Sequence, residues 1–401
     1  MTIAAKIQKA MQGQSWIRQM FELGIQLKQQ YGADKVFDLS LGNPILEPPE
    51  SVTKELQRIL ADPPPGMHRY MPNAGYPETR AAIAAHLAAQ MELPFTTGNI
   101  VMTCGAGGAL NVIFESILDP GDEVIIFAPY FPEYPFYIGN HGGETRIAPT
   151  NAAFQPDLET LRPLLTERTK AILVNSPNNP SGAVYPAALL KQLGQLLTET
   201  EAKYNSTIYL ISDEPYAQLT YDGLKMPPIY PAHPRSIVAT SFSKNLALPG
   251  ERIGYIAVNP SCPDAGTLVD AFTYCNRVLG FVNAPALMQW LVKDALDISV
   301  DVSWYQKKRD YLYKELTGMG YDLVKPEGAF YAFPASPIPD DVAFVQELLK
   351  WNVLVTPGTG FGSPGYFRIS FCMEDWVLEG AMEGFREAIK AHQGDALAPH
   401  P

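Results

Sequence analysis

The 401-residue sequence has few cysteines, no run of basic residues and no long apolar stretch. Its four cysteines, Cys104, Cys262, Cys275 and Cys372, form no Cys-x-x-Cys pair, which argues against a metal site or a disulfide framework and favours a reducing compartment. No stretch reaches the roughly 18 apolar residues of a membrane-spanning helix, and the N-terminal residues lack the apolar core of a secretory signal. We therefore expect a cytoplasmic protein without metal or membrane contact.

Positive charge is also scarce, since 30 Lys and Arg residues stand against 42 Asp and Glu residues, for a net charge of -12. Such a surface repels nucleic acid, so we expect no nucleic-acid partner. Any phosphate that the protein binds must instead be held by a local group of residues. The content of 46% hydrophobic and 18% charged residues is that of a globular protein, and the length predicts two domains.

Short apolar segments alternate with helical segments through the middle of the chain. We expect strands at residues 99–103, 123–127, 171–175, 208–212, 237–242 and 254–258, with helices at 107–117 and 186–200. This pattern predicts an α/β fold with a mostly parallel sheet covered by helices on both faces. In such sheets ligands bind beyond the carboxyl ends of the strands.

The two ends of the chain follow other patterns. One or two helices are expected within residues 3–31, and a single long helix is expected from about residue 284 to 316. A smaller α+β unit then follows, with strands at 321–324, 329–333, 353–356 and 366–370 and a helix at 376–391. We expect the tail at 394–401 to be disordered.

A lysine and three phosphate-type ligands follow the expected strand at 237–242. The strand delivers Ser241, Ser243 and Lys244 to its carboxyl end, and Arg252 comes one short loop later. Desolvation and nearby positive charge can deprotonate such a lysine and make it a nucleophile toward carbonyl groups. The serines and the arginine suit a phosphate. On this motif alone, an ordinary solvated lysine remains the alternative.

Two further charged residues occupy apolar surroundings. Asp213 follows the expected strand at 208–212, where a carboxylate is costly unless it meets a cation such as a protonated pyridine nitrogen. A helix N-cap explains Asp213 equally well. Arg368 lies on another expected strand and requires a carboxylate, which either a substrate or a structural salt bridge supplies.

Three weaker features lie near other strand ends. Asn179 belongs to a rigid polar turn at 175–182, which can fix an amide donor or be a mere turn. Small residues at 104–109 expose backbone N–H groups at a helix N-terminus and so favour a phosphate, although they match no nucleotide-binding loop. Tyr130 could stack on a planar cofactor, although core packing is the commoner use of such a ring.

Taken together and in order, these segments resemble the class I/II aminotransferase family of pyridoxal-phosphate (PLP) enzymes. The resemblance covers roughly residues 36–385. It rests on the segments at 40–44 (Ser-Leu-Gly-Asn-Pro), 70–80, 105–108, 178–182 (Asn-Asn-Pro-Ser-Gly), 213–216 (Asp-Glu-Pro-Tyr) and 241–244 (Ser-Phe-Ser-Lys), together with Arg252 and Arg368.

The resemblance implies a role for each of these residues, with PLP as the cofactor. Lys244 forms the Schiff base and moves a proton, Asp213 pairs with the pyridine nitrogen, and Tyr216 and Asn179 contact the phenolic oxygen of the ring. Tyr130 stacks on the ring. The phosphate is held by the turn at Gly105, Ala106 and Gly107, by Ser241, Ser243 and Arg252, and by Tyr70 of the partner subunit. The substrate α-carboxylate is received by Gly42, Asn179 and Arg368.

The resemblance also implies the architecture and the substrates. Residues 1–45 form an N-terminal arm and part of a small domain, residues 46–285 form the large PLP-binding domain, and residues 286–393 form the rest of the small α+β domain. A homodimer with shared active sites is implied, acting on an amino acid and a 2-oxo acid, with 2-oxoglutarate as the expected acceptor.

The chain departs from the family pattern at Gly107. Related prokaryotic aspartate aminotransferases carry a lysine there for the distal carboxylate, so the glycine argues against aspartate as the preferred donor; Arg277 is a candidate substitute. A PLP lyase of the same fold, either a carbon–sulfur β-lyase or an enzyme like aminocyclopropane-carboxylate synthase, shares the cofactor residues and remains the alternative. A PLP-binding regulator is disfavoured because the resemblance begins near residue 36, without a preceding DNA-binding module.

Overall fold

The computed structural model describes residues 2–5, 7–8 and 16–392. The tail at 394–401, which we expected to be disordered, lies outside these residues, as does part of the helical region expected at 3–31. That region contains the helix α2 (Trp16–Tyr31). Within the described residues, no helix is both long enough and apolar enough to cross a bilayer.

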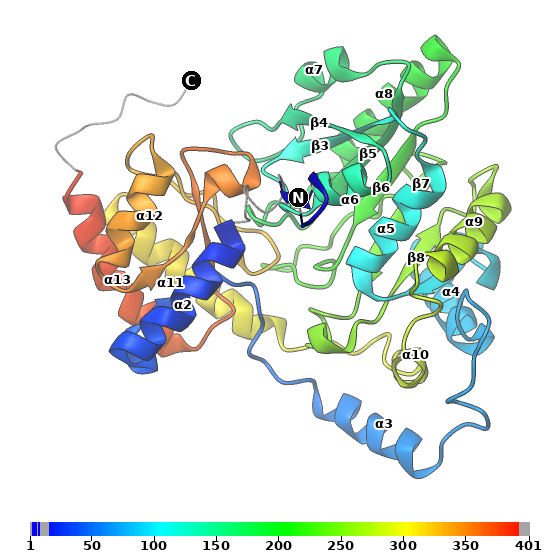
Figure 1. Ribbon diagram of the computed structural model, residues 1–401, viewed down its shortest axis with the longest axis horizontal. Coiled ribbons are helices and arrows are strands. Elements are labelled where there is room, and N and C mark those ends of the chain that lie inside the picture. Colours follow the sequence, from blue (N-terminus) through cyan, green and yellow to red (C-terminus); the bar gives the residue numbers. More distant parts are fainter. Residues whose placement is uncertain (1, 6, 9–15, 393–401) are drawn as a thin grey trace.

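A seven-stranded sheet forms the centre of the larger part of the molecule (Figure 1). Its strands lie in the order β2-β8-β7-β6-β5-β3-β4, and β8 runs opposite to the other six. The bounds are β2 (Ile100–Thr103), β3 (Glu123–Ala128), β4 (Glu144–Pro149), β5 (Thr169–Asn175), β6 (Tyr209–Asp213), β7 (Ser236–Ser241) and β8 (Gly254–Val258). The prediction of a mostly parallel α/β sheet is confirmed.

Helices cover both faces of this sheet because alternate strand residues point to opposite sides. Ile125 and Phe127 of β3 belong to one core cluster, while Val124 and Ile126 belong to another. The first cluster includes residues of α3 (Glu50–Ala61), α4 (Pro77–Met91), α8 (Ala187–Tyr204) and α10 (Ala286–Lys293). The second includes residues of α5 (Gly105–Ile117), α6 (Tyr134–Asn140) and α9 (Ala265–Val278). The helix α7 (Leu158–Leu161) follows β4.

The two ends of the chain meet in a second lobe, where the blue helix α2 lies near the red helix α13 (Figure 1). Its helices are α2, α11 (Val302–Met319), α12 (Asp341–Leu349) and α13 (Asp375–Lys390). Two small sheets join them: β1 (Phe37–Asp38) pairs with β10 (Val353–Leu354), and β12 (Phe367–Ser370) lies between β11 (Thr356–Pro357) and β9 (Tyr331–Ala332). A third core cluster fills this lobe.

The single long helix expected at 284–316 is wrong, because α10 ends at Lys293 and α11 begins at Val302. The Asp301 carboxylate caps α11 by accepting the Ser303 N–H, and the Val300 N–H donates to the carbonyl of Asn245. The connection between the helices is therefore tied to the loop that carries the lysine.

The strand expected at 321–324 is also wrong. There the Tyr321 N–H donates to the Leu316 carbonyl and its phenol donates to the Phe385 carbonyl, so tertiary contacts replace strand pairing. The sequence patterns also missed the strand β4 and the helix α9.

Candidate active site

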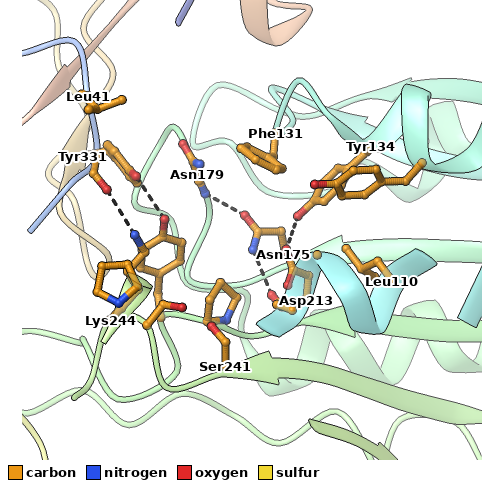
Figure 2. A pocket seen from close by; sticks show the side chains of 18 of the residues that line it. Leu41, Leu110, Phe131, Tyr134, Asn175, Asn179, Asp213, Ser241, Lys244 and Tyr331 are labelled. Atoms are coloured by element: carbon orange, nitrogen blue, oxygen red, sulfur yellow. Dashed lines mark hydrogen bonds between the residues drawn. The ribbon is translucent and has the colours of Figure 1, made fainter. Parts of the chain in front are cut away.

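A cavity of about 290 Å³ lies where the parallel strands end, beside the N-terminus of α5. The strands β5, β6 and β7 end at Asn175, Asp213 and Ser241, and all three residues line it (Figure 2). The sequence-predicted residues that line the cavity are Gly42, Ala106, Gly107, Asn179, Asp213, Tyr216, Ser241, Ser243, Lys244, Arg252 and Arg368. Residues from both lobes therefore converge on one space.

Lys244 follows β7 and points its amino group into this space. Its Nζ donates a hydrogen bond to the Gly42 carbonyl at 3.1 Å and lies 5.3 Å from the ring centre of Phe330. Burial, together with the positive charges of Arg252 and Arg368 and against the opposing effect of Cys372, lowers the pKa of Lys244 to about 8. A substantial fraction of the amine is therefore neutral near pH 8 and available as a nucleophile.

Asp213 ends β6 and is 6% exposed. Its Oδ2 accepts a hydrogen bond of 2.5 Å from the Tyr134 phenol, and the Asn175 side-chain amide donates to its backbone carbonyl (Figure 2). The other carboxylate oxygen, Oδ1, is buried and has no hydrogen-bond partner among the described residues. Burial raises the pKa of Asp213 to about 7, as expected for a carboxylate that no cation accompanies.

Close packing of glycines brings the N-terminus of α5 against Arg252. Gly105 has φ +72°, and a Cβ there would lie 3.0 Å from Nη2 of Arg252. A Cβ on Gly254 would lie 2.3 Å from the Thr240 carbonyl oxygen. The free N–H groups of the first turn of α5 therefore share the cavity with Arg252 and Ser241, which makes an anion-binding arrangement.

Arg368 lies on β12 and is only 2% exposed. One guanidinium nitrogen donates to the Asn179 side-chain oxygen at 3.1 Å and another to the Ser40 carbonyl. The guanidinium lies between the rings of Tyr331 and Phe361, at 4.6 and 4.8 Å from their centres. It forms no salt bridge with the described carboxylates, so the buried cation is available to an anionic ligand.

Tyr331 connects several of these residues. Its hydroxyl lies 3.0 Å from the Tyr216 hydroxyl, and its ring covers the Arg368 guanidinium. A Cβ on Gly42 would lie 1.8 Å from the Tyr331 hydroxyl oxygen. Only glycine therefore fits at position 42 while Tyr331 keeps this place.

Three predicted residues lie elsewhere. The Tyr130 ring packs against Gly362, while its neighbour Phe131 lines the cavity instead (Figure 2). Tyr70 is 93% exposed and is not among the cavity residues of its own chain. Gly105 packs against Arg252 and does not line the cavity, whereas the next residue, Ala106, does.

Sequence reasoning gave no site role to several residues that line the cavity: Leu41, Leu110, Phe131, Tyr134, Tyr137, Asn175, Pro215, Pro249 and Tyr331. Two of these residues could have been found from the pattern of the sequence around them. Asn175 ends an apolar strand and opens the polar turn, and Phe131 follows Tyr130 in a segment already singled out. The aromatic residues of α6 could not be found in this way, because ring-rich helices usually pack in a core.

The donors and acceptors of this cavity fit PLP. The unpartnered Asp213 Oδ1 suits a protonated ring nitrogen, and the N-terminus of α5 with Arg252 suits a phosphate. The weakly basic Lys244 suits the attachment of an aldehyde.

Comparison with known proteins leads to the same chemistry. The family described as "Aminotransferase class I and II" matches residues 34–385. The aspartate/prephenate aminotransferase of Thermus thermophilus is 35% identical over 378 residues, covering 91% of this chain and 93% of the relative. The aspartate aminotransferase of Thermotoga maritima is 33% identical, covering 89% and 92%.

Solved structures agree with these relatives. An aminotransferase of Eubacterium rectale has a TM-score of 0.95 at 35% identity and covers 98% of this chain and all of its own. The aspartate aminotransferase of Thermus thermophilus with maleate has a TM-score of 0.85 at 32% identity, with 97% and 100% covered. The chain belongs to the class I and II aminotransferases and is a PLP-dependent transaminase.

Proposed function

We propose that the enzyme moves the amino group of an L-amino acid to 2-oxoglutarate, with Lys244 as both the attachment point of the cofactor and the proton carrier. When bound, PLP supplies an electron-withdrawing ring that stabilises negative charge at the substrate Cα. One observation carries the proposal: the Lys244 amine and the unpartnered Asp213 Oδ1 line the same cavity, at the ends of neighbouring strands.

Lys244 acts as the base in this proposal. Its lowered pKa leaves part of the amine neutral, so Nζ can accept the proton from the substrate Cα and deliver it again. The hydrogen bond to the Gly42 carbonyl supports this role, since it holds Nζ in the cavity that Arg368 also lines.

Asp213 keeps the ring nitrogen of the cofactor protonated. The Tyr134 hydrogen bond and burial support this role, because they fix the carboxylate with one oxygen free. A cation bound at Oδ1 would offset the desolvation of the buried carboxylate and so lower the pKa of Asp213 again. Tyr216 and Asn179 are assigned to the phenolic oxygen of the ring.

The phosphate is assigned to the N–H groups of Ala106 and Gly107, to the side chains of Ser241, Ser243 and Arg252, and to the partner subunit through Tyr70. The helix N-terminus and the guanidinium support this assignment, as both favour an anion. We revise the stacking residue to Phe131, since its ring lines the cavity and that of Tyr130 does not.

The α-carboxylate of the substrate is assigned to Arg368, with Asn179 and Gly42 beside it. The guanidinium is nearly fully buried, and its two hydrogen-bond acceptors, the Asn179 side-chain oxygen and the Ser40 carbonyl, are uncharged. A bidentate carboxylate would complete its hydrogen bonding and orient Cα toward Lys244.

We propose a homodimer with shared active sites and a cytoplasmic location. The 93% exposure of Tyr70, an aromatic residue, supports contact with a partner. The four free cysteines support a reducing compartment.

The donor is proposed to be an amino acid other than aspartate, although several relatives are named aspartate aminotransferases. A Cβ on Gly107 would lie 3.2 Å from the Tyr137 hydroxyl, so an aromatic side chain borders the place where a lysine would begin. Arg277 stacks on Tyr274, 5.3 Å from its ring centre, and does not line the cavity of its own chain.

A panel of amino acids with and without 2-oxoglutarate tests this proposal. We expect glutamate to form from 2-oxoglutarate in step with loss of the donor. The lyase alternative predicts pyruvate and ammonia from an amino acid alone, with no glutamate, and that outcome would overturn the transfer to 2-oxoglutarate.

A further inference from the structure

Glu133 stands between two residues that line the cavity, Phe131 and Tyr134. It forms the N-cap position of α6, and its carbonyl accepts the N–H of Tyr137, a third lining residue. The side chain is partly buried. The first turn of α6 thus fixes Glu133 next to three residues of the cavity wall, although Glu133 itself is not one of the lining residues.

The carboxylate of Glu133 is not neutralised by the described part of the chain. Its Oε2 is buried without a hydrogen-bond partner, and no described lysine, arginine or histidine forms an ion pair with it. Burial raises the pKa of Glu133, while a hydrogen bond from its own backbone N–H and the more distant charge of Arg368 oppose that effect. A buried carboxylate is costly until a cation or a donor reaches it.

The charge of Glu133 acts on the substrate end of the cavity. It raises the pKa values of Tyr137 and Tyr331, as one of several causes after burial, and it counteracts the lowering of the pKa of Arg368. These are lining residues, and Arg368 is the residue to which we assign the α-carboxylate.

Under the proposed function, each charged residue that lines the cavity has a partner. Arg252 meets the phosphate, Arg368 meets the α-carboxylate, Asp213 meets the ring nitrogen, and Lys244 holds the cofactor. Glu133, next to the lining at Phe131 and Tyr134, has no such partner, and neither the cofactor nor the α-carboxylate offers it a positive charge. The remaining source is the side chain of the amino acid.

We propose that Glu133 determines donor specificity, and that it favours amino acids whose side chain ends in an ammonium or guanidinium group over those that end in a carboxylate. The inference rests on the proposed function and names its substrate class. Leu41, Leu110 and Phe131 line the cavity with apolar surface suited to the methylene stem of such a side chain. A distal carboxylate would instead meet an unpaired negative charge.

The test follows the first half-reaction of the PLP-loaded enzyme without any acceptor. Loss of the visible band of the lysine-bound cofactor is timed with L-lysine, L-ornithine, L-leucine and L-aspartate. We expect lysine or ornithine to react faster than aspartate. In Glu133→Gln, the ratio of second-order rate constants for lysine over leucine should fall about tenfold or more, as for loss of a charged hydrogen bond, and the ratio for aspartate over leucine should rise.

Binding is measured separately with the 2-methyl derivatives of lysine, leucine and aspartate, which lack the α-hydrogen and cannot be transaminated. Calorimetric titration of the loaded enzyme gives the dissociation constants. In Glu133→Gln we expect the affinity for the lysine derivative to fall relative to that for the leucine derivative, and the affinity for the aspartate derivative to rise. The control is Glu159→Gln, which removes the same charge from an exposed position on α7 and should leave the ratios unchanged.

Two results would overturn this inference without affecting the proposed function. The first is that aspartate reacts fastest with the wild-type enzyme. The second is that Glu133→Gln changes the rate constants for all donors equally, which would make Glu133 a counter-ion of Arg368. Failure of every amino acid to discharge the band would instead overturn the proposed function itself.

Discussion

The phenol of Tyr134 donates a hydrogen bond of 2.5 Å to Oδ2 of Asp213 and leaves Oδ1 as the carboxylate oxygen without a partner. Asn175, at the end of the adjacent strand, holds the backbone of the same aspartate. A helix and two strands together thus fix the carboxylate oxygen that we propose as the partner of the PLP ring nitrogen.

Replacing Tyr134 by Phe removes the hydrogen bond that orients this acceptor. We expect the affinity for PLP to fall at least about tenfold, because a hydrogen bond to a charged group contributes about 1.5–3 kcal/mol. The dissociation constant is measured by titrating the cofactor-free protein with PLP. Tyr204→Phe, which removes a partly exposed phenol of α8, is the matched control and should bind PLP normally. Unchanged affinity in Tyr134→Phe would show that Asp213 needs no such support.

The stability of the cofactor-free protein should depend on the pH through the titration of Asp213. Burial raises the pKa of Asp213 to about 7 in the folded state, above the ordinary value of 3.8. The folded state then binds the proton more tightly, so this group's contribution to stability declines as the pH rises from about 4 to about 7.

The urea midpoint at several pH values measures this effect. We expect the wild-type protein to lose stability relative to Asp213→Asn across that range. Glu214, whose pKa burial also raises to about 7, adds a similar decline in both proteins. Parallel curves for the two proteins would contradict the raised pKa of Asp213.

The attachment of PLP to the cofactor-free protein should depend on the pH through Lys244. With a pKa of about 8, the neutral amine increases about tenfold per pH unit below that value and levels off above it. Stopped-flow absorbance should show the attachment rate following the same curve. A rate that keeps rising to pH 10 would indicate an ordinary lysine.

Replacing Arg368 by Ala should weaken the binding of amino acids and leave the cofactor in place. Loss of a buried charged partner costs about 2–5 kcal/mol, so the KM for the donor should rise at least about thirtyfold. The visible band of the bound cofactor should persist, since Arg368 is assigned only to the substrate. Loss of the band, or an unchanged KM, would place the α-carboxylate elsewhere.

The sequence was sufficient to predict which residues at the ends of apolar strands come together in the cavity. Asp213 and Lys244 follow runs of buried residues, and the carboxyl ends of parallel strands meet at one edge, so their convergence followed from the strand pattern. The sheet itself was predictable for the same reason, except for the edge strand β4, whose exposed residues give no apolar run.

The remaining features depend on tertiary contacts that no local pattern carries. The break between α10 and α11 is stabilised by the contact of Val300 with Asn245, far away in the sequence. Tyr134 looks like a core aromatic until the fold brings it to Asp213. The choice of Phe131 over Tyr130 likewise depends on which ring the loop turns into the cavity.

The most direct test of the account is the attachment of PLP to Lys244. The protein is loaded with PLP, its visible band is recorded, and borohydride treatment and proteolysis then locate the label by mass spectrometry. We expect a visible band that borohydride removes, a single labelled peptide containing Lys244, and neither feature in Lys244→Ala. The absence of the band, or a label on another lysine of the wild-type protein, would contradict the account.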